Sequence, residues 1–190
     1  GTLGAGNHFL EIDEVEEVFF PEAAAAYGLF QGQAVFFVHS GSRGLGYQVC
    51  DDYLDVMAAY MRKHALTVPD RQLACAHIGS DEGRRYLSGL AAAANYAFAN
   101  RQLLAHQVRE TVQRVLRLGP RDAGILTVYD VGHNNAKFES HEVDGRRRDV
   151  LVHRKGATRA FPPGHPELPA AYRDVGQPVF IPGDMGRGSF

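Results

Sequence analysis

Short runs of apolar and β-branched residues recur along the chain, separated by polar or glycine-rich stretches. Runs of this length and composition are typical of buried β-strands. They predict strands at residues 34–38, 125–129, 150–152 and 178–181, and a further strand at residues 9–12.

Two longer stretches repeat their apolar residues with the period of an α-helix. The first covers about residues 47–66 and the second about residues 84–118. Because the second stretch is longer than a typical helix, we expect it to be broken, with Gly89 as one candidate position. Gly119-Pro120 is expected to end it, and the proline-rich residues 161–177 are expected to form a loop.

The composition is that of an ordinary globular protein, with 45% hydrophobic and 22% charged residues and no low-complexity tract. We find neither a repeat nor a linker, so residues 1–190 are predicted to form a single domain. No apolar run approaches the roughly 20 residues of a membrane-spanning helix, and the opening residues do not resemble a signal peptide. Cys50 and Cys75 form no CxxC pair, which favours a reducing, cytoplasmic location.

The net charge of −2 conceals an uneven distribution of charged residues. Residues 1–60 hold one basic residue against nine acidic ones, whereas residues 109–160 hold eleven basic residues against seven acidic ones. Seventeen of the twenty basic residues are arginine, whose guanidinium group suits bidentate contacts with phosphate. A GC-rich genome would explain the arginine bias equally well, and the net charge alone predicts no nucleic-acid partner.

Three of the nine histidines stand where a predicted strand meets a flexible turn. His39 follows the strand at 34–38, His133 follows the run that begins at Ile125, and His8 precedes the strand at 9–12. Imidazole suits borderline metals such as manganese, iron or zinc. Spacings of 31 and 94 residues match no short metal motif, so residue patterns alone leave open whether these side chains bind a metal. Four other histidines are expected to be solvated: His64, His106, His141 and His165. His77 follows Cys75, but their spacing matches no metal motif.

Two glycine-rich turns and one basic stretch are candidates for binding an anion. Residues 40–46 (SGSRGLG) contain Arg43, and residues 182–189 (PGDMGRGS) contain Arg187. Backbone N–H groups of such turns can point together at an anion, although ordinary tight turns have the same composition. Neither turn matches a Walker A loop or a dinucleotide fingerprint. The basic stretch is residues 153–159, and its cations are Arg154, Lys155 and Arg159. We expect it to contact a phosphate backbone, and the alternative is a solvated basic loop.

Six blocks of the sequence, in this order, resemble the RtcB family of RNA ligases: GTLGAGNHFLE, VHSGSRGLG, AANYAFANRQ, YDVGHNNAKFE, VHRKGATRAFPPG and FIPGDMGRGSF. The resemblance spans essentially all 190 residues. It implies an α+β fold, in which central β-sheet layers are flanked by helices.

The resemblance also implies an activity. Members of the family join an RNA 3′-phosphate or 2′,3′-cyclic phosphate to a 5′-hydroxyl, in tRNA splicing and RNA repair, with GTP and two manganese ions. A histidine is guanylylated, GMP passes to the RNA 3′-phosphate, and the 5′-hydroxyl then expels GMP. The implied partners are RNA ends and an archease-type helper protein.

Carried onto this sequence, the resemblance implies roles for particular residues. His8 matches a ligand of one manganese ion, and His39 and His133 match ligands of the second. The implied guanylate-binding residues are Asn7, His8, Glu11, His133, Asn134, Pro182, Gly183, Asp184, Met185 and Ser189. A carboxylate such as Glu11 can accept hydrogen bonds from guanine N1–H and the exocyclic amine, a pattern that adenine does not offer.

The sequence also departs from the family pattern. It lacks the upstream Asp-Val-Gly-Cys-Gly segment, the downstream Ser-His-Gly-Ala-Gly-Arg segment that carries the guanylylated histidine, and the C-terminal guanine-binding lysine. Cys50 and Cys75 lie in other blocks than the missing cysteine and do not replace it. His153 is not the nucleophile, because its block belongs upstream of the turn at residues 182–185. We therefore expect a domain truncated at both ends, inactive alone, with the guanylylated histidine beyond residue 190.

One departure lies inside the implied nucleotide site, where Asp184 stands at a position at which serine is usual. Its negative charge would either weaken guanylate binding or turn outward. Two alternatives to a ligase stay open. The first is a non-catalytic metal- or nucleotide-binding relative, and the second is a metal-dependent phosphoesterase that uses the same histidines.

Overall fold

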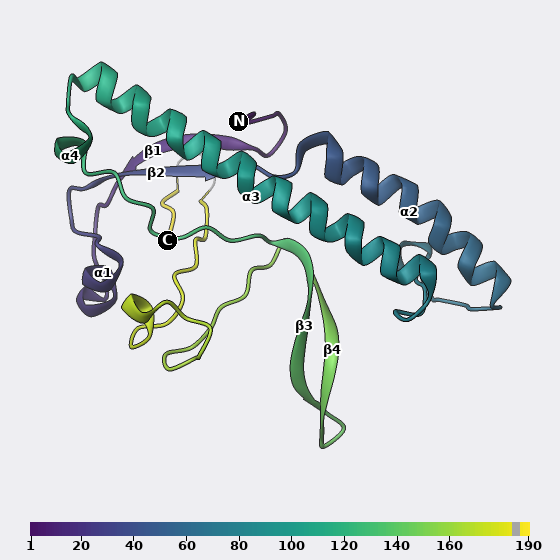
Figure 1. The fold of residues 1–190 in the computed structure, drawn as a ribbon. Coiled ribbons are helices and arrows are strands. Elements are labelled where there is room, and N and C mark those ends of the chain that lie inside the picture. Colours follow the sequence, from purple (N-terminus) through teal and green to yellow (C-terminus); the bar gives the residue numbers. More distant parts are fainter. Residues whose placement is uncertain (184–186) are drawn as a thin grey trace. The chain divides into compact units, whose positions relative to one another are not determined.

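The computed structural model describes residues 1–183 and 187–190 and combines helices with two small β-sheets (Figure 1). In chain order its elements are β1 (Phe9–Glu14), α1 (Pro21–Tyr27), β2 (Ala34–His39), α2 (Arg43–Lys63), η1 (Arg71–Leu73), α3 (Asp81–Leu116), α4 (Pro120–Ala123), β3 (Asn134–Val143), β4 (Arg146–Lys155) and η2 (Ala170–Tyr172). β1 pairs with β2, and β3 pairs with β4. The predicted mixed α+β class is confirmed. Within the described residues, none of the helices combines the length and apolar character needed to span a bilayer.

The chain forms two compact units, and each unit is built from two separate stretches of sequence. The first unit contains Gly1–Phe9 and Val38–Gly119, and the second contains Leu10–Phe37 and Pro120–Phe190. Each unit has its own set of internal contacts, and the single domain expected for residues 1–190 stays a prediction.

In the first unit, the long helices α2 and α3 pack along each other (Figure 1). Their buried apolar residues are Met57 and Tyr60 on α2 and Ala93 and Leu104 on α3. At Gly89 a Cβ atom would lie 3.2 Å from a methyl carbon of Val49 on α2, so glycine here allows the two helices to approach closely. The predicted break at Gly89 is wrong, because α3 continues through it for a total of 36 residues.

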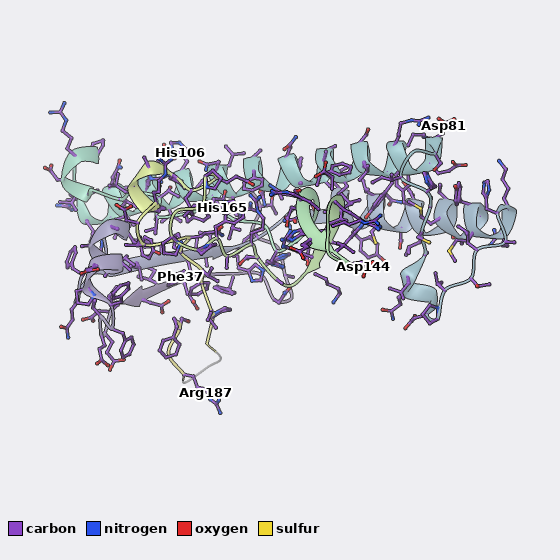
Figure 2. All side chains as sticks on the ribbon, turned by 90° about the horizontal axis from the view of Figure 1, so that it is seen from below. Phe37, Asp81, His106, Asp144, His165 and Arg187 are labelled. Atoms are coloured by element: carbon purple, nitrogen blue, oxygen red, sulfur yellow. The ribbon has the colours of Figure 1, made fainter. Side chains whose placement is uncertain are left out.

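The ends of α3 follow from capping residues. At the first end, the Ser80 hydroxyl accepts a hydrogen bond from the Gly83 N–H at 3.0 Å, next to Asp81, which is labelled in Figure 2. A hydroxyl cap and an acidic first turn both stabilise a helix N-terminus. At the other end, Arg117 adopts the left-handed conformation with φ 55°, so the helix ends at Leu116, slightly before the predicted stop.

In the second unit, β3 and β4 form an antiparallel hairpin whose register runs from Asn134↔Lys155 to Val143↔Arg146 (Figure 1). The turn contains two residues, Asp144 and Gly145, with φ values of 53° and 69°. Two positive φ values are what a type I′ turn requires, and Asp-Gly is one of its preferred sequences. Figure 2 labels Asp144. The predicted strand at 150–152 lies within β4, whereas the sequence pattern did not predict β3.

Aromatic contacts hold together the remainder of the second unit. The Tyr27 ring on α1 lies edge-on to the Tyr172 ring of η2, with 5.1 Å between centroids. The Tyr27 hydroxyl donates a hydrogen bond to the Gly176 carbonyl at 3.1 Å. Phe37 on β2 stacks on Phe180 with 3.9 Å between ring centroids. These contacts connect the first stretch of the unit with its last.

The predicted strands at 9–12 and 34–38 correspond to β1 and β2. The structure has no strand at 125–129 or 178–181, where apolar runs also predicted one. A strand needs a neighbour to pair with as well as suitable residues, and residue composition does not specify that neighbour. Both segments therefore have residues that suit a strand but no neighbouring strand to pair with among the residues that the structure describes.

Candidate functional site

Two of the histidines predicted to bind metal lie side by side in the first unit. The rings of His8 and His39 meet edge to face, with 5.4 Å between their centroids and an interplanar angle of 89°. His39 is the last residue of β2, and the Phe9 ring contacts its imidazole edge-on at 5.3 Å. The fold thus brings together two imidazoles that lie 31 positions apart in the chain.

Arg43, at the start of α2, contacts one nitrogen of this pair. Its guanidinium Nη1 lies 2.5 Å from Nδ1 of His8. Arginine can only donate, so Nδ1 accepts and neutral His8 carries its proton on Nε2. A Cβ atom at Gly4, whose φ is 101°, would collide with this guanidinium, so glycine there leaves the space that the arginine occupies. In this arrangement the lone pair of Nδ1 points at Arg43, and Nε2 carries the ring proton. A metal ion could therefore bind His8 only after Arg43 had moved away.

The third predicted ligand, His133, belongs to the second unit. Within residues 1–183 and 187–190, no group of three or more His, Cys, Asp or Glu side chains is arranged to hold a metal ion. His8 and His39 provide nitrogen donors of the kind that manganese and neighbouring metals accept. These two residues therefore fit part of a metal site, and the other ligands stay a prediction.

Hydrogen bonds hold the turn around His133 against the residues that follow β4. The His133 carbonyl accepts from the Ala157 N–H at 3.2 Å, and the Asn134 side-chain oxygen accepts from the Gly156 N–H at 2.9 Å. The Asn135 amide donates to the Gly132 carbonyl at 3.0 Å, while its own side-chain oxygen is buried with no hydrogen-bond partner in the described part of the chain. The predicted guanylate residues His133 and Asn134 thus adjoin the predicted phosphate-binding loop.

Along strand β1, partly covered positions alternate with exposed ones, and two of the partly covered residues are carboxylates. Glu11 and Asp13 are partly covered, whereas Leu10 and Ile12 are 39% and 64% exposed. Burial and the neighbouring carboxylate of Asp13 raise the pKa of Glu11. One oxygen of Asp13 is buried without a hydrogen-bond partner among the described residues. The covered face of β1 therefore offers hydrogen-bond acceptors, as the predicted contact between Glu11 and guanine requires.

The turn after residue 181 brings two predicted guanylate residues into contact. The Gly183 N–H donates to the Ser189 hydroxyl at 2.9 Å. A Cβ atom at Gly183 would lie 2.4 Å from the Arg187 carbonyl oxygen, so no larger residue fits there without a shift of the backbone. Pro182 and Gly183 line an open hollow formed by this turn. The predicted residues Asp184 and Met185 lie outside the described residues.

The family model described as "tRNA-splicing ligase RtcB" matches residues 1–190, the whole chain. The chain belongs to the RtcB family. It is 57% identical over 190 residues to the tRNA-splicing ligase RtcB of Pyrococcus abyssi, and covers 21% of that relative. It is 56% identical over 190 residues to proteins of the same name from Archaeoglobus fulgidus and Aeropyrum pernix, and covers 39% and 40% of them. In each comparison all of the present chain is matched, so it spans between a fifth and two fifths of these RtcB relatives.

In this RtcB chain, two of the predicted RNA-binding cations are held by carboxylates. Arg154 forms a bidentate salt bridge with Glu139, at 2.6 and 2.9 Å, and their side chains are 16% and 14% exposed. Arg159 pairs with Glu167 at 2.8 Å and lies over the Phe161 ring. Both arginines would have to leave these partners to bind phosphate. Lys155 is exposed at the end of β4.

Hydrogen bonds from Arg154, and in second place from His141, hold the pKa of Glu139 at about 2, against the opposing effect of burial. The same carboxylate raises the pKa of Arg154. Since a bidentate pair between opposite charges is among the stronger interactions of a partly buried site, this pair fixes one face of the hairpin.

The sequence pattern assigned no role to Asn100, although it lies in one of the blocks shared with the RtcB family. Asn100 is 6% exposed and occupies the buried side of α3 together with Ala93 and Leu104. The signal that could have pointed to Asn100 is a polar residue within the apolar side of a helix. A buried amide is nearly always hydrogen-bonded, so such a residue indicates a contact with another segment. Ser40, which follows His39, is the other buried polar residue of the described chain, at 5% exposed.

Proposed function

We propose that the protein containing these residues joins RNA ends, linking a 3′-phosphate or 2′,3′-cyclic phosphate to a 5′-hydroxyl with GTP and manganese. The observation that carries the proposal is the match of all 190 residues to the family model, supported by relatives named tRNA-splicing ligase at 52–58% identity. The RNA ends of tRNA splicing or repair are the proposed substrates. An archease-type helper and a cytoplasmic location belong to the same proposal.

The proximity of His8 and His39 supports a manganese site at this end of β2. As the family resemblance implies, His8 is the proposed ligand of one manganese ion, and His39 and His133 are proposed ligands of a second. When bound, manganese would polarise phosphate oxygens and stabilise charge on the attacking and leaving oxygens. His8 must exchange the guanidinium of Arg43 for the metal, which would leave Arg43 free to pair with an RNA phosphate.

The guanylate would be bound by the covered carboxylate of Glu11, together with Asn7 and the His133–Asn134 pair. Glu11 would select guanine over adenine by accepting from N1–H and the exocyclic amine. The glycine turn at Pro182, Gly183, Asp184, Met185 and Ser189 would contact the nucleotide phosphate. Its described part already adopts a tight conformation, in which Gly183 is bonded to Ser189.

Incubation of the protein as it is encoded with radiolabelled GTP and manganese tests this proposal. We expect an acid-labile GMP adduct on a histidine, followed by joining of an RNA with 3′-phosphate and 5′-hydroxyl ends. Replacing His39 with alanine should lower adduct formation about 100-fold or more, because it removes a proposed metal ligand. The matched control is His106→Ala, since His106 is an exposed histidine on α3 that pairs with Glu110 in the same helix.

The alternatives predict different results in the same assay. Cleavage of a cyclic-phosphate RNA end without GTP would favour a metal-dependent phosphoesterase. Binding of manganese and GTP by the intact protein without any adduct would favour a non-catalytic relative. Either result would contradict the proposed ligase.

A further inference from the structure

A single buried amide connects three distant segments of the first unit. The Asn100 side-chain oxygen accepts a hydrogen bond from the Thr2 N–H at 2.7 Å. The nitrogen of its NH2 group lies 3.0 Å from the Thr2 carbonyl oxygen, 3.1 Å from the Ser40 hydroxyl and 3.1 Å from the Gly41 carbonyl oxygen, so its two N–H groups are shared among three acceptors. Asn100 therefore pairs with both backbone groups of Thr2, much as a neighbouring strand would, and simultaneously holds the turn after β2.

Ser40 completes this network. Its hydroxyl contacts the Thr2 carbonyl at 3.2 Å and the Leu3 carbonyl at 2.8 Å. The Ser40 carbonyl in turn accepts from the guanidinium of Arg101, the residue after Asn100, at 3.2 Å. The network thus connects the N-terminal segment to the turn directly as well as through α3.

The two segments held in this way are those that carry the paired imidazoles. Thr2 and Leu3 lead into the glycine turn that presents His8, while Ser40 and Gly41 directly follow His39. The distance between the His8 and His39 rings therefore depends on the relative position of these two segments. Buried hydrogen-bond networks fix such positions because any partner left unsatisfied is costly.

We infer that Asn100 is a positioning residue that sets the separation of His8 and His39, and thereby the metal affinity of the site. The inference rests on the proposed function, because it takes these two histidines to be manganese ligands. Asn100 itself contacts neither imidazole through any of the bonds described above. Its effect passes through the backbone of the two segments, as that of a group supporting metal ligands does.

Replacing Asn100 with aspartate tests this role. The carboxylate can still accept from the Thr2 N–H, but it cannot donate to the three oxygens that the amide contacts. Manganese binding to the protein as encoded can be measured from the electron paramagnetic resonance signal of free Mn²⁺. We expect the dissociation constant to rise roughly tenfold, while circular dichroism shows the variant to be folded.

This readout separates positioning from a contribution to stability alone. A variant that is merely less stable but still folded at the assay temperature binds metal with unchanged affinity, since the unfolded fraction is negligible. The matched control is Asn95→Asp, which makes the same change at an exposed position of α3 and should leave the dissociation constant unchanged.

If Asn100→Asp does not fold, a second variant, Ser40→Ala, can test the same inference. It removes the hydroxyl contacts to Thr2 and Leu3 without adding a charge, and should raise the dissociation constant about threefold. Unchanged manganese affinity in every folded variant, with normal binding by the wild type, would overturn the inference and leave the proposed ligase standing. Absence of both manganese binding and GMP adduct in the wild type would instead overturn the proposed function, and the inference with it.

Discussion

At the scale of single residues, Arg43 contacts a nitrogen of His8, the residue that we propose as a manganese ligand. The guanidinium contacts Nδ1 of His8, and Arg43 itself adopts a positive φ of 53°, a conformation uncommon outside glycine. The arginine thus occupies a nitrogen of His8 that a metal ion would need. It does so from a backbone conformation that few residues other than glycine adopt. Its removal should have opposite effects on the two proposed binding partners of the site.

We predict that Arg43→Ala strengthens manganese binding about tenfold, because one hydrogen bond from a charged group no longer has to be broken. Binding of RNA that carries a 3′-phosphate should become weaker, since a cation is lost. Titration with Mn²⁺ and with RNA would measure the two effects separately. The control is Arg62→Ala, which removes an exposed arginine from the last turn of the same helix. Weaker manganese binding by Arg43→Ala would show that Arg43 supports His8 as a ligand.

The sequence was informative about residues whose position depends on local structure. His39 was predicted at the end of a strand and is the last residue of β2. Its proximity to His8 depends on hydrogen bonds to Asn100, 98 positions from Thr2, and no local pattern reveals a contact over such a separation. The roles of both histidines as ligands were implied by family resemblance, and they stay predictions.

At the scale of elements, the Glu139–Arg154 pair links the two strands of the hairpin. The folded pKa of Glu139, at about 2, lies below its ordinary value of 4.5. The pair therefore contributes its full stability above about pH 4.5, and the contribution is lost as the pH falls towards 2.

We predict that Glu139→Gln lowers the free energy of unfolding of the hairpin by roughly 1.5–3 kcal/mol at neutral pH. The difference from the wild type should vanish between about pH 4.5 and pH 2, because the wild-type carboxylate then becomes neutral as well. Amide hydrogen exchange across β3 and β4, measured as a function of pH, would measure this difference in stability. Glu142→Gln, at an exposed position of the same strand, should change the stability by less than about 0.5 kcal/mol. A pH-independent effect of Glu139→Gln would contradict this assignment.

Elements with a strong internal pattern were predictable, and those that depend on a neighbour were not. The helical period of α2 and α3 was recognisable because one side of each helix is apolar. Strand β3 was missed because its residues are mostly polar on both faces, although Asp144-Gly145 is a hairpin signal in the sequence. Segments 125–129 and 178–181 showed the opposite error, since their residues favour strands but no strand is formed there.

At the scale of the whole molecule, the chain is only part of the length of the RtcB proteins that it matches. The proposed ligase needs a histidine that is guanylylated, and we assign that role to no residue of this chain. The residues described here would then supply part of the metal site and part of the guanylate site, but not the group that carries GMP.

We predict that a polypeptide of residues 1–190 alone forms no GMP adduct and binds manganese weakly, because two adjoining imidazoles are too few ligands to hold the ion firmly. The guanylylation assay, run beside a full-length relative such as the Archaeoglobus fulgidus protein, would test this. An adduct on the isolated polypeptide would contradict the prediction. Mass spectrometry would then identify the histidine that carries it, with His153 as the first position to examine.

The two-residue turn at Asp144-Gly145 has a practical consequence. It is exposed, it joins β3 to β4, and none of the proposed ligand residues lies in it. Exposed turn tips are also where chains best tolerate inserted residues. A fluorescent label or short epitope placed there would report on the protein during RNA joining without altering any of the proposed ligand residues.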